Sequence, residues 1–211
     1  MKRIFVITMA VFLTSVVSAC GGSDENTKDS KPVNTLTTKT ETPVSREDST
    51  KTEMEPVIEE IPLDAQRDFY IKTTKPEIDH IVDEFDFIWE TLWTYTFQSV
   101  TDGKITSSEA WKKLDTAKKR YDLIYQQTGE LPTDGLDKEL KKKLGSFQVE
   151  IEDAIAFRLE AIKKAKKMFD KGEFPASEVN DIQDIVDQSG DYFLQGILYL
   201  TDIENTLGIE N

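Results

Sequence analysis

The chain has 211 residues, with 40 acidic and 26 basic side chains and a formal net charge of −14 at pH 7. A field of this sign repels nucleic acid and anionic lipid headgroups, so the composition excludes both as partners. One cysteine and one histidine exclude an internal disulfide and any site that needs several such ligands. The length fits one folded domain.

The first twenty residues have the pattern of a secretory signal peptide. Lys2 and Arg3 supply a positive start, only Thr8 interrupts the apolar run from residue 4 to 13, and small residues lead to Cys20. This run is too short to predict a permanent membrane span.

Residues 17–20, Val-Ser-Ala-Cys, resemble the lipobox of bacterial lipoproteins. The resemblance implies that residues 1–19 are removed and that Cys20 becomes a diacylated N-terminus, because two acyl chains make a stable anchor. The alternative is an incidental cysteine in an ordinary cleavable signal. We expect a lipid-anchored protein on the extracytoplasmic face of the cell membrane, with the membrane as its partner through the lipid on Cys20. The Gly-Gly start and the tether that follows resemble those of Gram-positive lipoproteins.

The segment 20–62 is predicted to be a disordered tether. Ser, Thr, Lys, Asp, Glu and Asn dominate it, prolines interrupt it, and aromatic residues are absent. Its low apolar content cannot repay the entropy of ordering. The folded domain is therefore predicted to span 63–211.

Apolar residues at three- and four-residue spacing predict four helices in this domain. Pro76 marks the first turn of the first, a capping box at Thr106 and Glu109 opens the second, the third starts near Asp134, and Gly172 ends it before the fourth. Antiparallel packing predicts an all-α, up-down four-helix bundle. The core stripes are Ile78, Ile81, Val82, Phe85, Trp89, Leu92, Trp93 and Val100; Ala110, Leu114, Ala117, Tyr121, Ile124 and Tyr125; Leu136, Leu140, Leu144, Phe147, Ile151, Ala154, Ile162, Ala165 and Phe169; Val179, Ile182, Val186, Phe193, Ile197, Leu200 and Leu207. Trp111 is also assigned to the core.

A shorter segment, 64–72, is predicted to form one or two helical turns ahead of the first helix. Phe87 points away from the main stripe of that helix. We expect the short segment to fold back and cover Phe87, which would otherwise be exposed.

Two metal-like motifs have simpler explanations. Glu77 and His80 share the Glu-x-x-His spacing of di-iron bundles, but those sites need the motif twice, and His80 is predicted to face solvent. The segment 102–109 resembles half of an EF-hand loop, but Gln98 and Val100 stand where the first carboxylates belong. We predict no metal site and no cofactor.

Asp181, Asp184, Asp187 and Asp191 recur along one side of the fourth helix. They are candidates for an acidic docking strip that binds a basic partner. The simpler interpretation is an ordinary solvated helix face.

Arg158 interrupts the apolar stripe of the third helix, where an unpaired guanidinium would be costly. The predicted packing brings it level with Asp187 and Asp191, which predicts a structural ion pair with one of them. The alternative is a charged group that lines an interior pocket for an anionic ligand.

The sequence contains no assembled catalytic group, phosphate loop or nucleophile elbow, so we predict a non-enzyme. The expected function is a binding or interaction module at the cell envelope, with another envelope protein as partner. The alternative is a small-ligand binder that uses the bundle interior around Arg158 and the tryptophans.

Overall fold

A computed structural model describes residues 61–209 of the chain. Within that range the protein is all-helical and contains no strand, which confirms the predicted fold class at this level. None of the described helices is long and apolar enough to cross a membrane. The predictions for the signal peptide, for Cys20 and for residues 20–60 of the tether lie outside the described residues.

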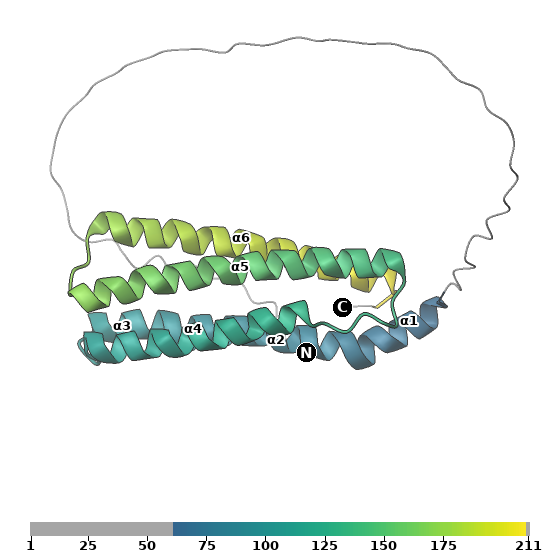
Figure 1. The fold of residues 1–211 in the computed structure, drawn as a ribbon, viewed down its shortest axis with the longest axis horizontal. Helices are drawn as coiled ribbons and strands as arrows, with labels where there is room; N and C mark the ends of the chain where they lie inside the picture. Colours follow the sequence, from purple (N-terminus) through teal and green to yellow (C-terminus); the bar gives the residue numbers. More distant parts are fainter. Residues whose placement is uncertain (1–60, 210–211) are drawn as a thin grey trace, which may run out of the picture. The chain divides into compact units, whose positions relative to one another are not determined.

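The first helical rod runs without interruption from residue 63 to 101 (Figure 1). It consists of α1 (Leu63–Phe69), a π-helical turn (Tyr70–Thr74), α2 (Lys75–Ile88), a second π-helical turn (Trp89–Thr94) and α3 (Tyr95–Thr101). Pro76 lies in the first turn of α2, as predicted, but the helical rod does not begin there, because α1 and a π-helical turn precede α2 without a break. Proline has no N–H for the carbonyl four residues earlier, at Lys72. The first π-helical turn contains that carbonyl, so the backbone adjusts there instead of stopping.

This continuity also corrects the prediction for the segment 64–72. It continues into α2 and does not fold back over Phe87. Phe69 packs on the backbone of Gly135, where a side chain on the glycine would collide with it. Phe87 stays 45% exposed, and the Arg120 guanidinium lies 4.4 Å from its ring centroid.

Three further helices follow: α4 (Ser107–Gly129), α5 (Lys138–Lys171) and α6 (Ala176–Thr206). The predicted capping box is confirmed, because the Glu109 N–H donates to the Thr106 hydroxyl at 3.2 Å and the Thr106 N–H donates to the Glu109 carboxylate at 2.8 Å. Helix α5 begins later than predicted because Asp137 caps it and accepts from the Leu140 N–H at 2.8 Å. Gly172, with φ +67°, ends α5 as predicted.

Polar side-chain contacts join α4 and α5 near both ends of α4. Gln148 near the start of α5 donates to the Thr128 carbonyl at the end of α4, and Lys166 near the end of α5 pairs with Asp115 near the start of α4. Helices α5 and α6 lie side by side along their length (Figure 1). The Ser189 hydroxyl on α6 donates to the Ala154 carbonyl on α5 at 2.8 Å.

The predicted stripes supply most of the buried core. The differences are local: Ile88, Ile155, Ile185 and Ile203 are buried although they lie outside the predicted stripes, and Tyr125 is 41% exposed although its spacing predicts a core position. Tyr121 and Trp93 are buried, whereas Trp89 and Trp111 are half-buried.

Candidate functional site

Helices α2 and α6 are not among the closely packed helix pairs, and the rings of Phe85 and Phe193 meet between them. We call this region the α2–α6 seam; it is bounded by Phe85 and Trp89 on the first rod and by Gly190 and Phe193 on α6, with Arg158 of α5 as its floor. The rings of Phe85 and Phe193 stack across it with centroids 4.5 Å apart. The seam is the candidate functional site because its floor is charged.

Arg158 is buried, with 7% of its surface exposed, and its Nε and Nη1 atoms have no hydrogen-bond partner among residues 61–209. The predicted ion pair with Asp187 or Asp191 is absent from residues 61–209, so that prediction is wrong. Asp187 is exposed and accepts from the Gln183 side chain at 2.8 Å instead. Asp187 and Arg158 share a level along the helices, but the aspartate faces solvent while the arginine faces the core.

Aromatic rings surround the Arg158 guanidinium. Its central carbon lies 3.6 Å from the ring centroid of Trp89 and 5.5 Å from that of Phe85. Trp89 stacks on Trp93 at 5.3 Å, and Phe85 meets Tyr121 edge-on at 5.5 Å. Such cation–π contacts contribute up to about 2 kcal/mol when desolvated, which is less than the several kcal/mol that burial of an unpaired ion costs.

The electrostatics of the seam reflect this imbalance. Burial lowers the pKa of Arg158, and the more distant carboxylates of Asp86 and Asp187 offset only part of that shift. The pKa of Asp86 is raised by burial and by the neighbouring negative charges of Glu90 and Asp83. Negatively charged side chains around Asp86 therefore lie within electrostatic reach of the Arg158 guanidinium.

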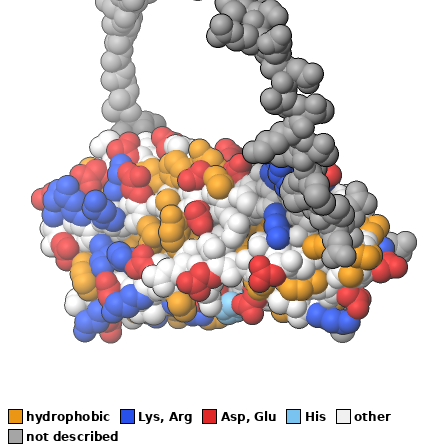
Figure 2. All heavy atoms as spheres, turned by 45° about the vertical axis from the view of Figure 1, so that its right-hand side comes forward, with side chains coloured by type: hydrophobic (Ala, Val, Ile, Leu, Met, Phe, Trp, Pro, Cys, Tyr) orange, Lys and Arg blue, Asp and Glu red, His pale blue; other side chains and the backbone are white. Residues whose placement is uncertain are grey.

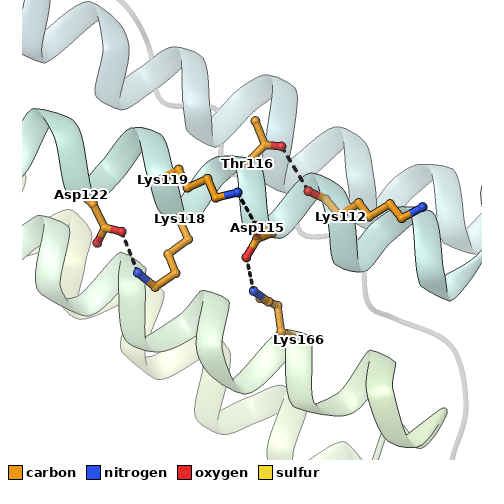
Figure 3. A network of polar contacts seen from close by, with 7 residues as sticks. All are labelled: Lys112, Asp115, Thr116, Lys118, Lys119, Asp122 and Lys166. Atoms are coloured by element: carbon orange, nitrogen blue, oxygen red, sulfur yellow. Dashed lines mark hydrogen bonds and ion pairs between the residues drawn. The ribbon is translucent and has the colours of Figure 1, made fainter.

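A second cation of α5 provides a contrast within the same fold. Lys166 lies 3.8 Å from the ring centroid of Trp111, and its Nζ atom also pairs with Asp115 at 2.6 Å (Figure 3). Asp115 accepts from Lys119 as well, at 3.0 Å. These two lysines hold the pKa of Asp115 at about 2. The Lys166 ammonium that lies on Trp111 therefore has a carboxylate partner, whereas the Arg158 guanidinium that lies on Trp89 has none among the described residues.

The four acidic residues that the sequence analysis singles out on α6 are all exposed, and Asp181 also lies 3.8 Å from the Lys164 ammonium. Two leucines that the sequence analysis does not single out, Leu194 and Leu198, are also exposed, at 49% and 61%. We call the exposed residues 184, 187, 191, 194 and 198 the α6 strip; helical spacing places them on the outward side. Acidic and apolar side chains also lie close together on the surface view (Figure 2).

The metal-like motifs contribute no site. His80 and Glu77 are exposed, as predicted for His80. The segment 102–109 forms a turn and the helix cap described above. No group of three or more metal-ligating side chains occurs within the described part of the chain.

Two surface hollows lie outside the α2–α6 seam. One, of about 450 Å³, is at the start of α4, and Trp111 and Phe169 form its apolar part. The other, of about 200 Å³, is bounded by Glu150, Asp191, Tyr192 and Gln195. Arg158 lines neither of them.

The comparisons with known proteins add no family to this description. No family model, no curated protein and no solved structure matches the chain. Functional inference therefore depends on the residues themselves.

Proposed function

We propose that this protein is a lipid-anchored, extracytoplasmic interaction module of the cell envelope. Cys20 carries the lipid, the segment 20–62 is a flexible tether, and the helices from residue 63 onward close into an antiparallel up-down bundle. The bundle presents the α6 strip to another envelope protein. The exposure of three carboxylates and two leucines on one side of α6 is the observation that carries this proposal.

The chemistry of the α6 strip indicates the kind of partner. Exposed leucines favour contact with an apolar surface, while the carboxylates beside them attract positive charge and repel acidic surfaces. A helix or strand with lysine or arginine next to apolar side chains matches this pattern. Repulsion by the strip argues against the anionic bilayer surface as its target.

The anchor is tested with Cys20→Ala. The substitution should release the protein from membranes or leave an uncleaved precursor, and it should abolish labelling by radioactive palmitate. The anchor proposal fails if the wild-type protein is found in the medium without label.

The interaction surface is tested by photo-crosslinking on intact cells. A photoreactive residue at Leu198 should yield one dominant partner, identified by mass spectrometry. The matched control is Leu123 of α4, which is 53% exposed and lies outside the strip. Asp187→Lys together with Asp191→Lys should suppress the adduct at position 198. Equal adducts at both positions, or an adduct insensitive to charge reversal, would contradict the proposal.

A second candidate function is the binding of a small ligand in the α2–α6 seam. The observation that favours it is the buried Arg158 with unused N–H donors. Natural folds rarely leave such donors without a partner. A ligand that supplies the partner would bind tightly for its size, because the protein has already desolvated the charge.

A further inference from the structure

The strongest unexplained feature of the molecule is the charge at the floor of the α2–α6 seam. Arg158 is 7% exposed, and two of its three side-chain nitrogens lack partners in the part of the chain that the structure describes, although the chain is rich in carboxylates. Removing a charge from water without a hydrogen-bonded counter-ion costs several kcal/mol. A carboxylate suits the site best, because guanidinium–carboxylate hydrogen bonds are charge-assisted and strong.

The walls of the seam determine what the carboxylate is attached to. Trp89, Phe85 and Phe193 present apolar ring surface next to the guanidinium. A ligand whose body is apolar keeps the site dry and stacks or packs on these rings. A strongly hydrated anion such as free phosphate would lose its hydration shell without replacing it.

A carboxylate close to Arg158 selects against a simple anion. Asp86 of α2 is half-buried, directly follows Phe85 and lies one turn before Trp89, and both of those rings contact the Arg158 guanidinium. A ligand that carries an ammonium group beside its carboxylate satisfies both Arg158 and Asp86. This charge pattern is that of an α-amino acid.

Two features of the seam allow entry. Gly190 follows Ser189, whose hydroxyl bonds to Ala154, one turn before Arg158 on α5. Because helical side chains point toward the helix N-terminus, the Arg158 side chain extends toward this level. No atom of another helix lies within 4 Å of the position that a Cβ on Gly190 would occupy. On the opposite wall, half-buried Trp89 starts a π-helical turn, a feature often found at functional sites.

We propose that the α2–α6 seam binds a free α-amino acid with an apolar side chain. Arg158 receives the carboxylate, Asp86 receives the ammonium group, and Trp89 moves aside to pack on the side chain. This inference rests on the second candidate function and specifies its ligand class. It is independent of the α6 strip as an interaction surface.

The test uses the purified full chain and isothermal titration calorimetry with three matched probes. L-phenylalanine has both charges, L-phenylalaninamide lacks the carboxylate, and 3-phenylpropionate lacks the ammonium group. L-phenylalanine should bind with a dissociation constant below about 1 mM. The amide and 3-phenylpropionate should each bind at least about tenfold more weakly, which corresponds to 1.4 kcal/mol. Trp89 fluorescence should change on binding and the change should disappear in Trp89→Phe.

Arg158→Met keeps the volume of the stem and removes the charge, so it should weaken L-phenylalanine binding at least about tenfold. Lys166→Met is the matched control: it removes the other α5 cation that lies on a tryptophan and should leave binding unchanged. Circular dichroism establishes that both variants remain helical.

The amino-acid assignment is overturned if L-phenylalanine does not bind, if the amide binds equally well, or if Arg158→Met binds as the wild type does. If 3-phenylpropionate binds through Arg158 as tightly as L-phenylalanine, the amino-acid assignment is also wrong, but the ligand-binding function survives. Absence of binding by all three probes, with an intact adduct at Leu198, would leave the interaction module as the function and remove the seam as a site.

Discussion

Two cations of α5 lie on tryptophans from other helices, and their surroundings differ in one respect. Lys166 on Trp111 has a carboxylate partner, Asp115, whereas the Nε and Nη1 atoms of Arg158 on Trp89 have none. The ring contact alone therefore does not distinguish a structural charge from a receptive one. The hydrogen bonding of the N–H donors distinguishes the two, because cation–π attraction is smaller than the cost of burying an unpaired charge.

The largest expected effect comes from the aromatic wall of the α2–α6 seam. Phe85 is 2% exposed and contacts both Phe193 and Tyr121. Phe85→Ala should lower the free energy of unfolding by about 3–5 kcal/mol, the usual range for a buried ring. Trp111→Ala should cost less, because Trp111 is half-buried. Urea denaturation of both variants measures the difference, and equal losses would mean that the Lys166 region is as much a part of the core as the seam.

Removing the charge of Arg158 and removing that of Lys166 should change the free energy of unfolding in opposite directions. Arg158→Met should raise the free energy of unfolding by about 1–2 kcal/mol, since the desolvation cost removed exceeds the cation–π attraction lost. Lys166→Met should lower it, because Asp115 loses a partner. Thermal and urea unfolding without added ligand check both signs. A loss of stability in Arg158→Met would indicate that the guanidinium is hydrogen-bonded in the folded protein. Arg158 and Lys166 would then both be structural charges.

The sequence predicts features that depend on residues close together in the chain better than features that depend on contacts between helices. Periodicity predicts the core stripes, and the Thr106 cap is predictable because it involves residues three positions apart. Periodicity also marks Arg158 as unusual, because it breaks a stripe. Its real neighbour, Trp89, comes from another helix, and position along the helix axis alone leads to Asp187. Asp187 lies on the outward side of α6. Its position along the helix axis does not reveal on which side of the helix it lies.

The first rod shows a second limit of sequence reasoning. Proline usually marks a helix start, and Pro76 taken alone predicts one. The chain continues the helix through a π-helical turn because Tyr70 and Thr74 are buried there and Phe69 packs on Gly135. Tertiary burial outweighs the local preference, and a single sequence contains little sign of it.

A smaller effect is a pH dependence of stability that the Lys166–Asp115 pair should show and the Arg158 region should not. The pKa of Asp115 is about 2 in the folded protein, below its ordinary value of about 3.9. Its contribution to stability is therefore complete above about pH 4 and is lost as the pH falls toward 2. Between pH 5 and 2, the thermal midpoint of the wild type should fall more steeply than that of Lys166→Met. Asp115→Asn, which has no titrating group at this position, should show the shallowest fall, and Lys166→Met should lie between it and the wild type because Lys119 still pairs with Asp115. A steep fall in Asp115→Asn would assign the pH dependence to other carboxylates.

The smallest effect tests whether the α2–α6 seam has room beside Arg158. Gly190 and Gly145 are both inside helices, and neither has an atom of another helix within 4 Å of the position that an alanine Cβ would occupy. Glycine in a helix is less stable than alanine by about 0.5–1 kcal/mol, so Gly190→Ala and Gly145→Ala should stabilise the protein by similar amounts. Gly196→Ala should not, because its methyl group would lie 2.8 Å from Ile151 Cδ1. If Gly190→Ala instead destabilises the protein as Gly196→Ala does, the seam is closed at that level and leaves no entry above Arg158. If it stabilises the protein yet weakens L-phenylalanine binding while Gly145→Ala does not, the open space beside Gly190 belongs to the site.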